Sequence, residues 1–456
     1  MKIFLSNNSN KFLYLPIEIF TREFHSKIYL AHEAVQKGWT VLIGPKYDIN
    51  PMMRYLPSGI YSGIGFHKSA AKLAKIIKSF GHKVFSQDEE GLVRLSPEFY
   101  KEYRVDENIF DNSDLIFCWG KRHQEIMEDI FKKSSKIRSI GNGRVDILSS
   151  KLKKIFEKDA ELIKKENGNF ILINGNFGSA NHFSGKENFL KELESRGWLD
   201  TEQKKEYQLN RIEFQNSIFL KMMSLSVEIA KTGKKIIVRP HPSENLNKWK
   251  EFVSDYTDNI KIIRSGNVIP WIMASNYLIH NGCTTAIEAV LMGKDVISFR
   301  PFKNKSVESI LPNAISSCME TQESVLNYLK NDKNEYSLND EALKILNDNI
   351  EQNFQHEDAT SRIINMIEKL EIKESRPTFL SNLVNEILFR LNLLKMKISR
   401  KIYNSNFQYE LIKCPPLANT EVTKLLTEIA DIKSEDKNFE VCNFNKHSII
   451  IQPKNN

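Results

Sequence analysis

Residues 277–291, which read YLIHNGCTTAIEAVL, contain the transition that decides the fold. The apolar run Tyr277–Ile279 predicts a buried strand, and Thr285–Leu291 predicts the first turns of a helix. The small and polar residues between them turn backbone N–H groups and hydroxyls toward the positive end of the helix dipole, which favours a bound anion. An ordinary helix capped by Thr284 or Thr285 is the alternative.

The junction supplies a set of candidate ligands for a nucleotide phosphate and its ribose. Backbone amides and hydroxyls are suited to the phosphate, and a carboxylate one helical turn further on is suited to sugar hydroxyls. The candidates are Asn281, Gly282, Thr284 and Thr285 for the phosphate and Glu288 for the ribose.

The same alternation of apolar runs and amphipathic helices occurs twice along the chain. Strands are predicted at 12–17, 40–44, 83–85, 115–119 and 137–140, and again at 170–174, 235–239, 261–263, 277–280 and 295–299. Strands separated by helices form parallel sheets covered on both faces. We therefore predict two doubly wound, Rossmann-like α/β domains, residues 1–150 and 151–370, facing a central cleft, and a C-terminal extension over 371–456.

Composition excludes several classes of protein. The hydrophobic fraction of 41% and the charged fraction of 27% are those of a globular domain. The net charge of +8 is spread along the chain, which suits anionic ligands or an anionic membrane surface but does not predict nucleic-acid binding. The five scattered cysteines predict reduced thiols, and no apolar run reaches eighteen residues, so a cytoplasmic protein is expected.

A helical pattern in the extension has two interpretations. Apolar residues recur at helical spacing among basic ones, at Leu383, Ile387, Leu391, Leu394 and Ile398. The helix either lies on anionic lipid, as a peripheral contact at the inner face of the cytoplasmic membrane, or packs its apolar side in a core, which is the commoner case.

Residues 238–245, VRPHPSEN, give a second chemical signal. Two prolines hold His241 rigidly at the end of a predicted strand, where it can donate to a phosphate oxygen and assist a departing nucleotide. Arg239 is a candidate partner for a phosphate or carboxylate. A rigid turn in which His241 caps backbone groups is the alternative.

Two further strand ends carry polar residues. Residues 87–91, QDEEG, follow a predicted strand, and Glu89 or Glu90 facing the cleft could accept a proton from a sugar hydroxyl. A solvated acidic turn is the alternative. Residues 174–182, NGNFGSANH, allow close approach of backbone to a ligand, with Asn174 and Asn176 as candidate contacts.

Taken together, these segments resemble CMP-sugar-dependent GT-B glycosyltransferases. Bacterial sialyltransferases of that kind carry an acidic D/E-D/E-G motif, an HP motif and a later Ser/Thr motif, which match residues 89–91, 241–242 and 284–285. More broadly, the chain is similar to bacterial surface carbohydrate biosynthesis proteins related to Kdo transferases. That similarity runs from residues 15–18 and 22–24 to Pro301, and extends to the Cys-Pro-Pro tail at 414–416.

The resemblance implies a metal-independent transfer of a CMP-linked sugar acid to a glycan or glycolipid acceptor, with no cofactor. It makes Glu89 or Glu90 the catalytic carboxylate and His241 the group that assists departure of CMP. Because the donor carries its own carboxylate, Arg22, Lys68 or Arg239 would bind it. Asn174 and Asn176 stand where a nucleophilic Asp would be needed for retention, which favours inversion.

Other functions fit the same pattern. A transferase or polymerase using CDP-glycerol or a UDP-sugar is one, since residues 141–146 are similar to loops of such enzymes. A UDP-sugar 2-epimerase and a non-catalytic assembly factor with a glycosyltransferase-like shell are the others.

Overall fold

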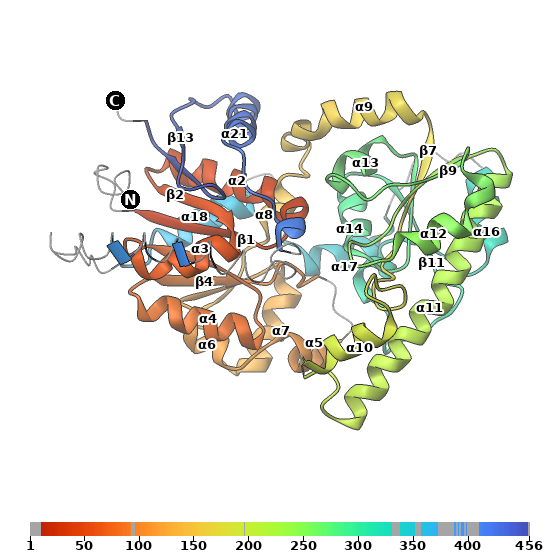
Figure 1. The fold of residues 1–456 in the computed structure, drawn as a ribbon, viewed down its shortest axis with the longest axis horizontal. Coiled ribbons are helices and arrows are strands. Elements are labelled where there is room, and N and C mark those ends of the chain that lie inside the picture. The colour runs from red at the N-terminus through yellow and green to blue at the C-terminus, as the bar shows by residue number, and fades with distance from the viewer. Residues whose placement is uncertain are drawn as a thin grey trace. The chain divides into compact units, whose positions relative to one another are not determined.

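The computed structural model describes residues 11–92, 96–195, 197–330, 338–351, 357–372 and 410–454, and also residues 387, 388, 391, 394, 395 and 398 (Figure 1). The chain divides into two compact units. Unit 1 comprises Met1–Gly91, Arg104–Ile155 and Ile350–Asn456, and unit 2 comprises Leu92–Tyr103 and Phe156–Asn349.

Unit 1 is built on one eight-stranded sheet, in the order β13-β14-β2-β1-β3-β4-β5-β6. Six strands are parallel to one another: β1 (Phe12–Ile17), β2 (Thr40–Pro45), β3 (Ile60–Ile64), β4 (Lys83–Gln87), β5 (Leu115–Cys118) and β6 (Ile137–Ser139). Of the other two, β14 (Ile449–Gln452) pairs with β2 in the antiparallel direction, and β13 (Glu440–Asn443) pairs antiparallel with β14. The strands β1 and β5 carry no charged residue and are fully buried, because helices cover both faces of the sheet.

The helices of unit 1 lie on both sides of this sheet, and Figure 1 shows α21 on one side and α4 with α6 on the other. They are α2 (Phe20–Gln36), α3 (Lys46–Ile49), α4 (Lys68–Ser79), α6 (Asn108–Asn112), α7 (Lys121–Phe131), α8 (Gly143–Asp146), α18 (Ala359–Ile367) and α21 (Asn419–Lys433), with the 3-10 helices η1 (Asn50–Tyr55) and η2 (Leu152–Phe156).

None of the strands predicted from the sequence lies in the stretch 51–66. The stretch forms η1 and the central strand β3, which pairs with β1 and β4. The backbone passes so close to β1 that a Cβ on Gly59 would lie 2.5 Å from the Phe12 carbonyl oxygen. A short strand with glycine at its entry and in its interior gives little periodic signal.

Unit 2 contains a six-stranded parallel sheet, in the order β12-β11-β10-β7-β8-β9. The strands are β7 (Phe170–Asn174), β8 (Lys235–Arg239), β9 (Ile260–Ile262), β10 (Tyr277–His280), β11 (Asp295–Phe299) and β12 (Ser317–Met319). The helices are α5 (Pro97–Arg104), α9 (Glu157–Asn167), α10 (Lys186–Ser195), α11 (Glu202–Lys231), α12 (Leu246–Phe252), α13 (Val268–Ala274), α14 (Thr284–Leu291), α15 (Ile310–Ala314), α16 (Gln322–Lys330) and α17 (Asp340–Asn349), with the 3-10 helix η3 (Ser254–Tyr256). This strand order is that of a Rossmann domain.

One face of the unit 2 sheet packs against α11, α12 and α16 in a single apolar cluster. Phe219 of α11 contacts the rings of Phe177 and Trp249, with centroids 5.1 and 5.3 Å apart. Burying aromatic rings in this way supplies much of the free energy that holds helix to sheet. The prediction of an α/β protein with two doubly wound domains is confirmed.

The end of the chain folds back onto unit 1. The bounds of the two units therefore differ from the predicted domains, which end at residues 150 and 370. Asp146 is buried and accepts hydrogen bonds from Ala359 N (3.1 Å) and Thr360 N (2.8 Å), so the end of α8 caps α18, which lies more than 200 residues later. Burial, followed by the charge of Asp358, raises the pKa of Asp146 to about 7. The chain therefore leaves unit 2 at Asn349, and β13 and β14 extend the first sheet.

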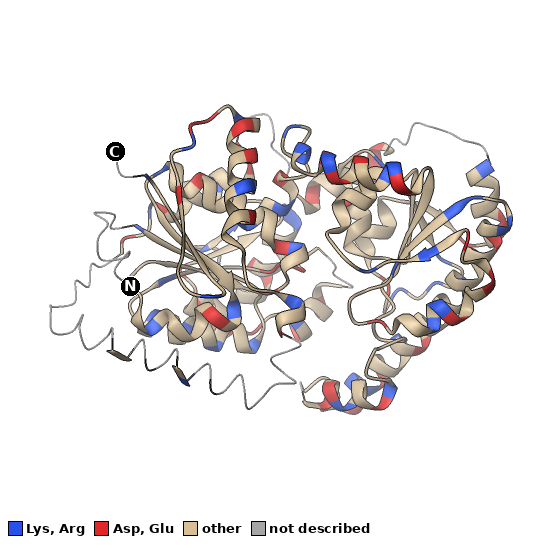
Figure 2. Cartoon of the chain, turned by 45° about the horizontal axis from the view of Figure 1, so that its top comes forward, with Lys and Arg blue, Asp and Glu red and all other residues tan. Residues whose placement is uncertain are grey.

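Acidic and basic residues both occur on the helices of each unit (Figure 2). In the part of the chain that the structure describes, no helix is long and apolar enough to cross a bilayer.

Candidate functional site

The strand order of unit 2 reverses between β7 and β10, and this switch point lies at the predicted phosphate site. Asn174 at the end of β7 is in register with His280 at the end of β10 and with Arg239 at the end of β8. The loops that follow all three strands therefore begin side by side at one edge of the sheet. Doubly wound domains bind ligands outside this edge, at the switch point.

His280 fixes the turn between β10 and α14. Its ring is buried, Nδ1 accepts a hydrogen bond from Gly282 N (2.8 Å), and Nε2 lies 2.9 Å from Ser316 Oγ. Burial lowers the pKa of His280 to about 3, so the ring is neutral and serves as a backbone acceptor. Gly282 has φ of +93°, a left-handed conformation that favours glycine.

The side chains that follow Gly282 are partly engaged. Asn281 Oδ1 accepts a hydrogen bond from Asn176 N (2.8 Å), which joins the loop after β10 to the loop after β7. Thr285 Oγ1 lies 2.6 Å from Cys283 Sγ, and that thiol is within 3.5 Å of the Asn174 carbonyl oxygen. Thr284 and Glu288 are half-buried, in the first two turns of α14.

Asn174 lies at this edge with a buried side-chain oxygen that has no partner among the described residues. The side chain is 4% exposed, and the oxygen without a partner is Oδ1. A buried amide oxygen without a donor is unfavourable by about 1–3 kcal/mol, so such an atom at a switch point marks a place where a ligand group can donate.

The loop after β8 holds His241 by a short network within the turn, which corresponds to the alternative of a rigid turn in which His241 caps a backbone group. His241 Nδ1 accepts a hydrogen bond from Ser243 N (3.2 Å) and lies 2.7 Å from Ser243 Oγ. The neutral ring therefore carries its proton on Nε2, where it can donate to an anion. A Cβ on Gly178 would lie 2.1 Å from Ser243 Oγ and 3.2 Å from His241 Nδ1, so glycine is required for the loops after β7 and β8 to approach.

Glu244 joins the loops after β7 and β8 through buried hydrogen bonds, a role that no pattern in the sequence indicated. The carboxylate is fully buried and accepts hydrogen bonds from His241 N (2.8 Å), Phe177 N (3.3 Å) and Trp249 Nε1 (3.1 Å). Burial raises the pKa of Glu244 even though these donors oppose the shift. The position of His241 thus depends on a buried acid three residues later.

We expect Glu244→Ala to destabilise unit 2 by about 3 kcal/mol, because three donors lose their acceptor and each costs about 1–3 kcal/mol when it is left unpaired. Urea unfolding followed by tryptophan fluorescence measures the loss, since Trp249 is one of the three donors. Glu251→Ala, at an exposed position on α12, is the matched control. Equal stability of the two variants would contradict the assigned role.

Arg239 does not have the environment expected of a ligand for phosphate or carboxylate. Its Nη1 and Nη2 atoms donate to the carbonyl oxygens of Ser265 and Gly266, both at 2.8 Å, and the guanidinium lies 5.2 Å from the centre of the Trp271 ring. Burial lowers the pKa of Arg239 to about 10. The side chain therefore fixes the loop after β9, and both of these donors are already bound to carbonyl oxygens.

Phe183 is an exposed aromatic residue beside the His241 loop. Its backbone N donates to Ser243 O (2.9 Å), while the side chain is 51% exposed. An exposed ring at this place can stack on a base or a sugar. The signal available in the sequence was the aromatic pair His182-Phe183 after the glycine-rich stretch.

Unit 1 has its own switch point, between β1 and β3, and the predicted acidic turn follows the neighbouring strand β4. Glu90 is exposed and pairs with Arg22 Nη1 (2.8 Å) and Arg104 Nη1 (2.8 Å). The guanidinium groups of Arg104 and Arg22 lower the pKa of Glu90 to about 2. Asp88 in turn pairs with Arg104 Nη2 (2.9 Å).

The carboxylate of Glu89 has a different environment from those of Asp88 and Glu90. Among the described residues its carboxylate forms no ion pair within 4.0 Å, and it lies 3.5 Å from Asn142 Nδ2. Burial, followed by the negative charge of Glu23, raises the pKa of Glu89, although Lys27 and Arg144 oppose the shift. The pKa values of Glu89 and Glu90 are therefore shifted in opposite directions, and Glu89 holds its proton more tightly than an ordinary glutamate.

The two candidates for binding a donor carboxylate are placed differently. Arg22 Nη2 contacts Glu23 (2.9 Å) while Nη1 contacts Glu90, so a ligand carboxylate would compete with two resident ones. Lys68 is exposed at the start of α4. The preceding residue His67 caps α4 through a hydrogen bond from Ala70 N to Nδ1 (3.3 Å) and lies near the charges of Arg104 and Asp88. The sequence analysis did not single out His67.

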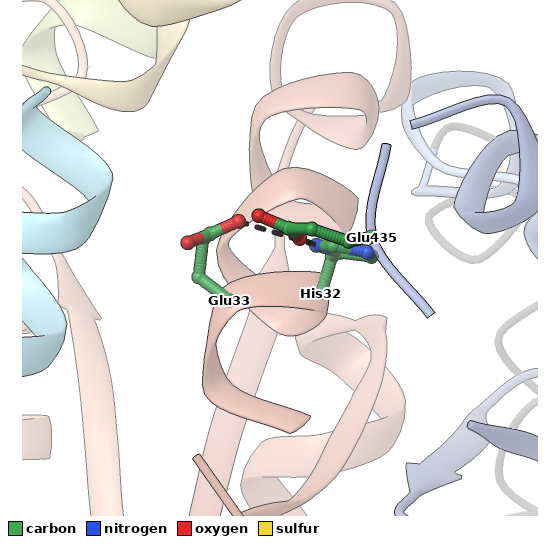
Figure 3. Close-up of side chains that lie close together, drawn as sticks. All are labelled: His32, Glu33 and Glu435. Atoms are coloured by element: carbon green, nitrogen blue, oxygen red, sulfur yellow. Dashed lines mark hydrogen bonds and ion pairs between the residues drawn. The ribbon is translucent and has the colours of Figure 1, made fainter. Parts of the chain in front are cut away.

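A group of possible metal ligands lies elsewhere in unit 1. His32, Glu33 and Glu435 bring three ligand atoms within 4.8 Å of one another (Figure 3). Lys433 forms ion pairs with both Glu33 and Glu435, so a metal ion would have to displace an ammonium group that already neutralises these carboxylates. The group is better explained as the contact that fastens the end of α21 to α2.

Comparison with known proteins gives a likeness of fold. No family model and no curated protein matches the chain. Among solved structures, UDP-GlcNAc 2-epimerase from Methanocaldococcus jannaschii is 12% identical with a TM-score of 0.45, over 78% of this chain and 99% of that one. S. aureus MnaA with UDP gives 14% and 0.48 over 79% and 96%, and the wall teichoic acid polymerase TagF gives 11% and 0.45 over 79% and 88%. At these values the likeness indicates nothing about activity.

Proposed function

We propose that this chain is a glycosyltransferase that moves a CMP-activated ulosonic or nonulosonic acid, such as Kdo or a sialic acid, onto a bacterial cell-surface glycan of capsule, lipopolysaccharide or glycoprotein. The observation that carries the proposal is the joined set of loops after β7, β8 and β10. They present Asn174 Oδ1, His241 and the start of α14 at one switch point.

On the donor side, unit 2 would hold the nucleotide. The N-terminal amides of α14 and the Thr284 hydroxyl would bind the phosphate, and Asn174 Oδ1 would accept a hydrogen bond from the donor. Negative charge develops on the phosphate as the glycosidic bond breaks, and His241 Nε2–H would stabilise it. Arg239 has no part in this proposal, since its donors are already bound.

On the acceptor side, Glu89 would accept the proton of the attacking hydroxyl. Its raised pKa supports this role, because a more basic carboxylate is a better acceptor for that proton. Glu90 would instead hold Arg22 and Arg104 in place. A single base without a second nucleophilic carboxylate is consistent with inversion.

The donor class rests on the three short motifs, and a nucleotide screen tests it. Thermal unfolding is followed in the presence of CMP, CDP, UDP and GDP, each in excess. A ligand at a hundredfold excess over its dissociation constant stabilises the folded state by about 2.7 kcal/mol. We expect CMP to give the largest shift and Asn174→Ala to reduce it.

Three outcomes of the screen contradict the proposal. A shift with UDP alone would point to a UDP-sugar transferase or epimerase, and a shift with CDP alone to a CDP-glycerol enzyme. The absence of a shift with every nucleotide would favour a non-catalytic assembly factor.

A further inference from the structure

One helix of unit 1, α4, turns a row of lysines to solvent. Its side chains at Ala71, Ala74 and Ile77 are buried, and the helix packs through them against α6, β3 and β4. The opposite side of the helix, which we call the outer face of α4, consists of the exposed residues Lys68, Ser69, Lys72, Lys75, Ile76 and Ser79. It carries three positive charges and one large apolar side chain.

The positive charge of this face is not neutralised within the part of the chain that the structure describes. Residues 49–87 contain six lysine and arginine residues and no acidic one, although the whole chain has 57 acidic residues in 456. Among the described residues, the three lysines of the outer face form no ion pair within 4.0 Å. Lys78, at the border of the buried side, pairs instead with Asp114 Oδ1 (3.4 Å). Unpaired ammonium groups on successive turns of a helix attract a surface of negative charge.

The types of side chain on the outer face indicate which anionic partner it fits. Its cations are all lysines, which are point charges on flexible stems, and none is an arginine, whose planar fork binds one phosphate at two points. Mobile lipid headgroups do not require such a fork. The face is the convex side of a helix, and it carries no aromatic ring on which a nucleic-acid base could stack.

An exposed apolar side chain lies among these lysines. Ile76 is 41% exposed and lies next to Lys75 and one helical turn from Lys72. In the headgroup region of a bilayer, such a side chain enters the acyl boundary while the lysine stems reach the phosphates. We propose that the outer face of α4 docks this protein on the surface of an anionic phospholipid bilayer. The helical pattern at 383–398 lies largely outside the described residues and has no part in this proposal.

The N-terminal end of α4 connects the outer face with the acidic turn after β4. His67 caps the helix by accepting a hydrogen bond from Ala70 N (3.3 Å), and its ring lies near the charges of Arg104 and Asp88. Asp88 begins the turn that carries Glu89. Docking along α4 would therefore keep this turn close to the headgroups. If the proposed function holds, an acceptor carried on a lipid would be presented to Glu89 at that place.

Vesicle flotation of the full-length protein tests the docking. The vesicles are phosphatidylcholine alone, or phosphatidylcholine with phosphatidylglycerol in equal parts. We expect binding to the anionic vesicles that weakens as salt rises, because salt screens the lysine charges. Lys72→Gln combined with Lys75→Gln should lower the partition coefficient by about 25-fold, since each lysine near an anionic surface contributes about fivefold. Both side chains are exposed, so the variant should unfold at the same temperature as the wild type.

The matched control carries Lys158→Gln and Lys165→Gln, which remove the same charge from exposed positions on α9. Four acidic residues lie among the lysines of that helix, so flotation should not change. Flotation requires no turnover, and failure of the proposed glycosyl transfer would therefore not alter these results.

Ile76→Gln tests the apolar part of the contact. We expect it to lower the partition coefficient by about threefold or more, because it removes an apolar group that leaves water on docking. This loss should persist at high salt, since salt does not screen apolar contact. Unchanged binding of this variant would contradict docking through the outer face of α4.

Two other results would overturn the proposal. One is a wild-type protein that does not float with anionic vesicles. The other is an equal loss of flotation in the α4 and α9 lysine variants, which would mean that binding depends on net charge and not on the outer face of α4.

Discussion

Glu89→Gln is expected to lower kcat by about 10²–10⁴-fold while leaving the CMP-induced thermal shift intact, because it removes a general base and does not touch the nucleotide loops of unit 2. A coupled assay of CMP release measures the rate. Glu90→Gln is the matched comparison, and we expect a smaller loss, since Glu90 is neutralised by Arg22 and Arg104. Equal losses in the two variants would contradict the assignment of Glu89 as the base.

The same substitution should also affect stability and the pH profile. Folding raises the pKa of Glu89, so the folded state binds more protons than the unfolded state in the pH range above the ordinary glutamate value. Ionising Glu89 as pH rises therefore lowers the free energy of unfolding. At neutral pH Glu89→Gln should unfold at the same or a higher temperature than the wild type. Activity of the wild type should fall as pH drops through the raised pKa.

His241→Ala is expected to lower kcat by about 10²–10³-fold, the usual effect of removing one donor from a developing oxyanion. The residue is exposed and its backbone N is held by Glu244, so the variant should remain folded. Single-turnover measurements with a saturating donor separate the rate of bond cleavage from nucleotide binding.

His241→Gln distinguishes hydrogen bonding from proton transfer at this position. The amide keeps an N–H donor at a place similar to Nε2 but does not titrate. Partial recovery of the rate relative to alanine would indicate a hydrogen-bonding role. Unchanged turnover in both variants would contradict any catalytic role for His241 and favour an assembly factor.

The sequence predicted those parts of the fold in which buried strands are uniformly apolar. Ile171–Ile173 and Leu278–Ile279 read as strands because parallel strands covered on both faces need apolar residues at every position. The strands β3 and β12 are short and contain serine or glycine, so no apolar run signals them. Their place in the sheets is set by neighbours distant in sequence.

The candidate site was predictable only where it depends on strand ends. Because neighbouring parallel strands end at the same edge of a sheet, the loops carrying Asn174, His241 and Gly282 were expected to meet within unit 2. No local pattern indicated that carbonyl oxygens would take up Arg239 or that two carboxylates would hold Arg22. The difference between Glu89 and Glu90 likewise arises from Arg104 and Glu23, residues on other elements.

The pairing of β14 with β2 has a consequence during synthesis of the chain. Domains normally fold in the order in which they leave the ribosome, the N-terminal one first. Here unit 2 ends at Asn349, whereas β14 at Ile449–Gln452 covers the side of β2 that would otherwise be open. Unit 2 can therefore fold before the sheet of unit 1 is complete. A nascent or prematurely ended chain would expose the edge of β2, where another chain could pair and cause aggregation.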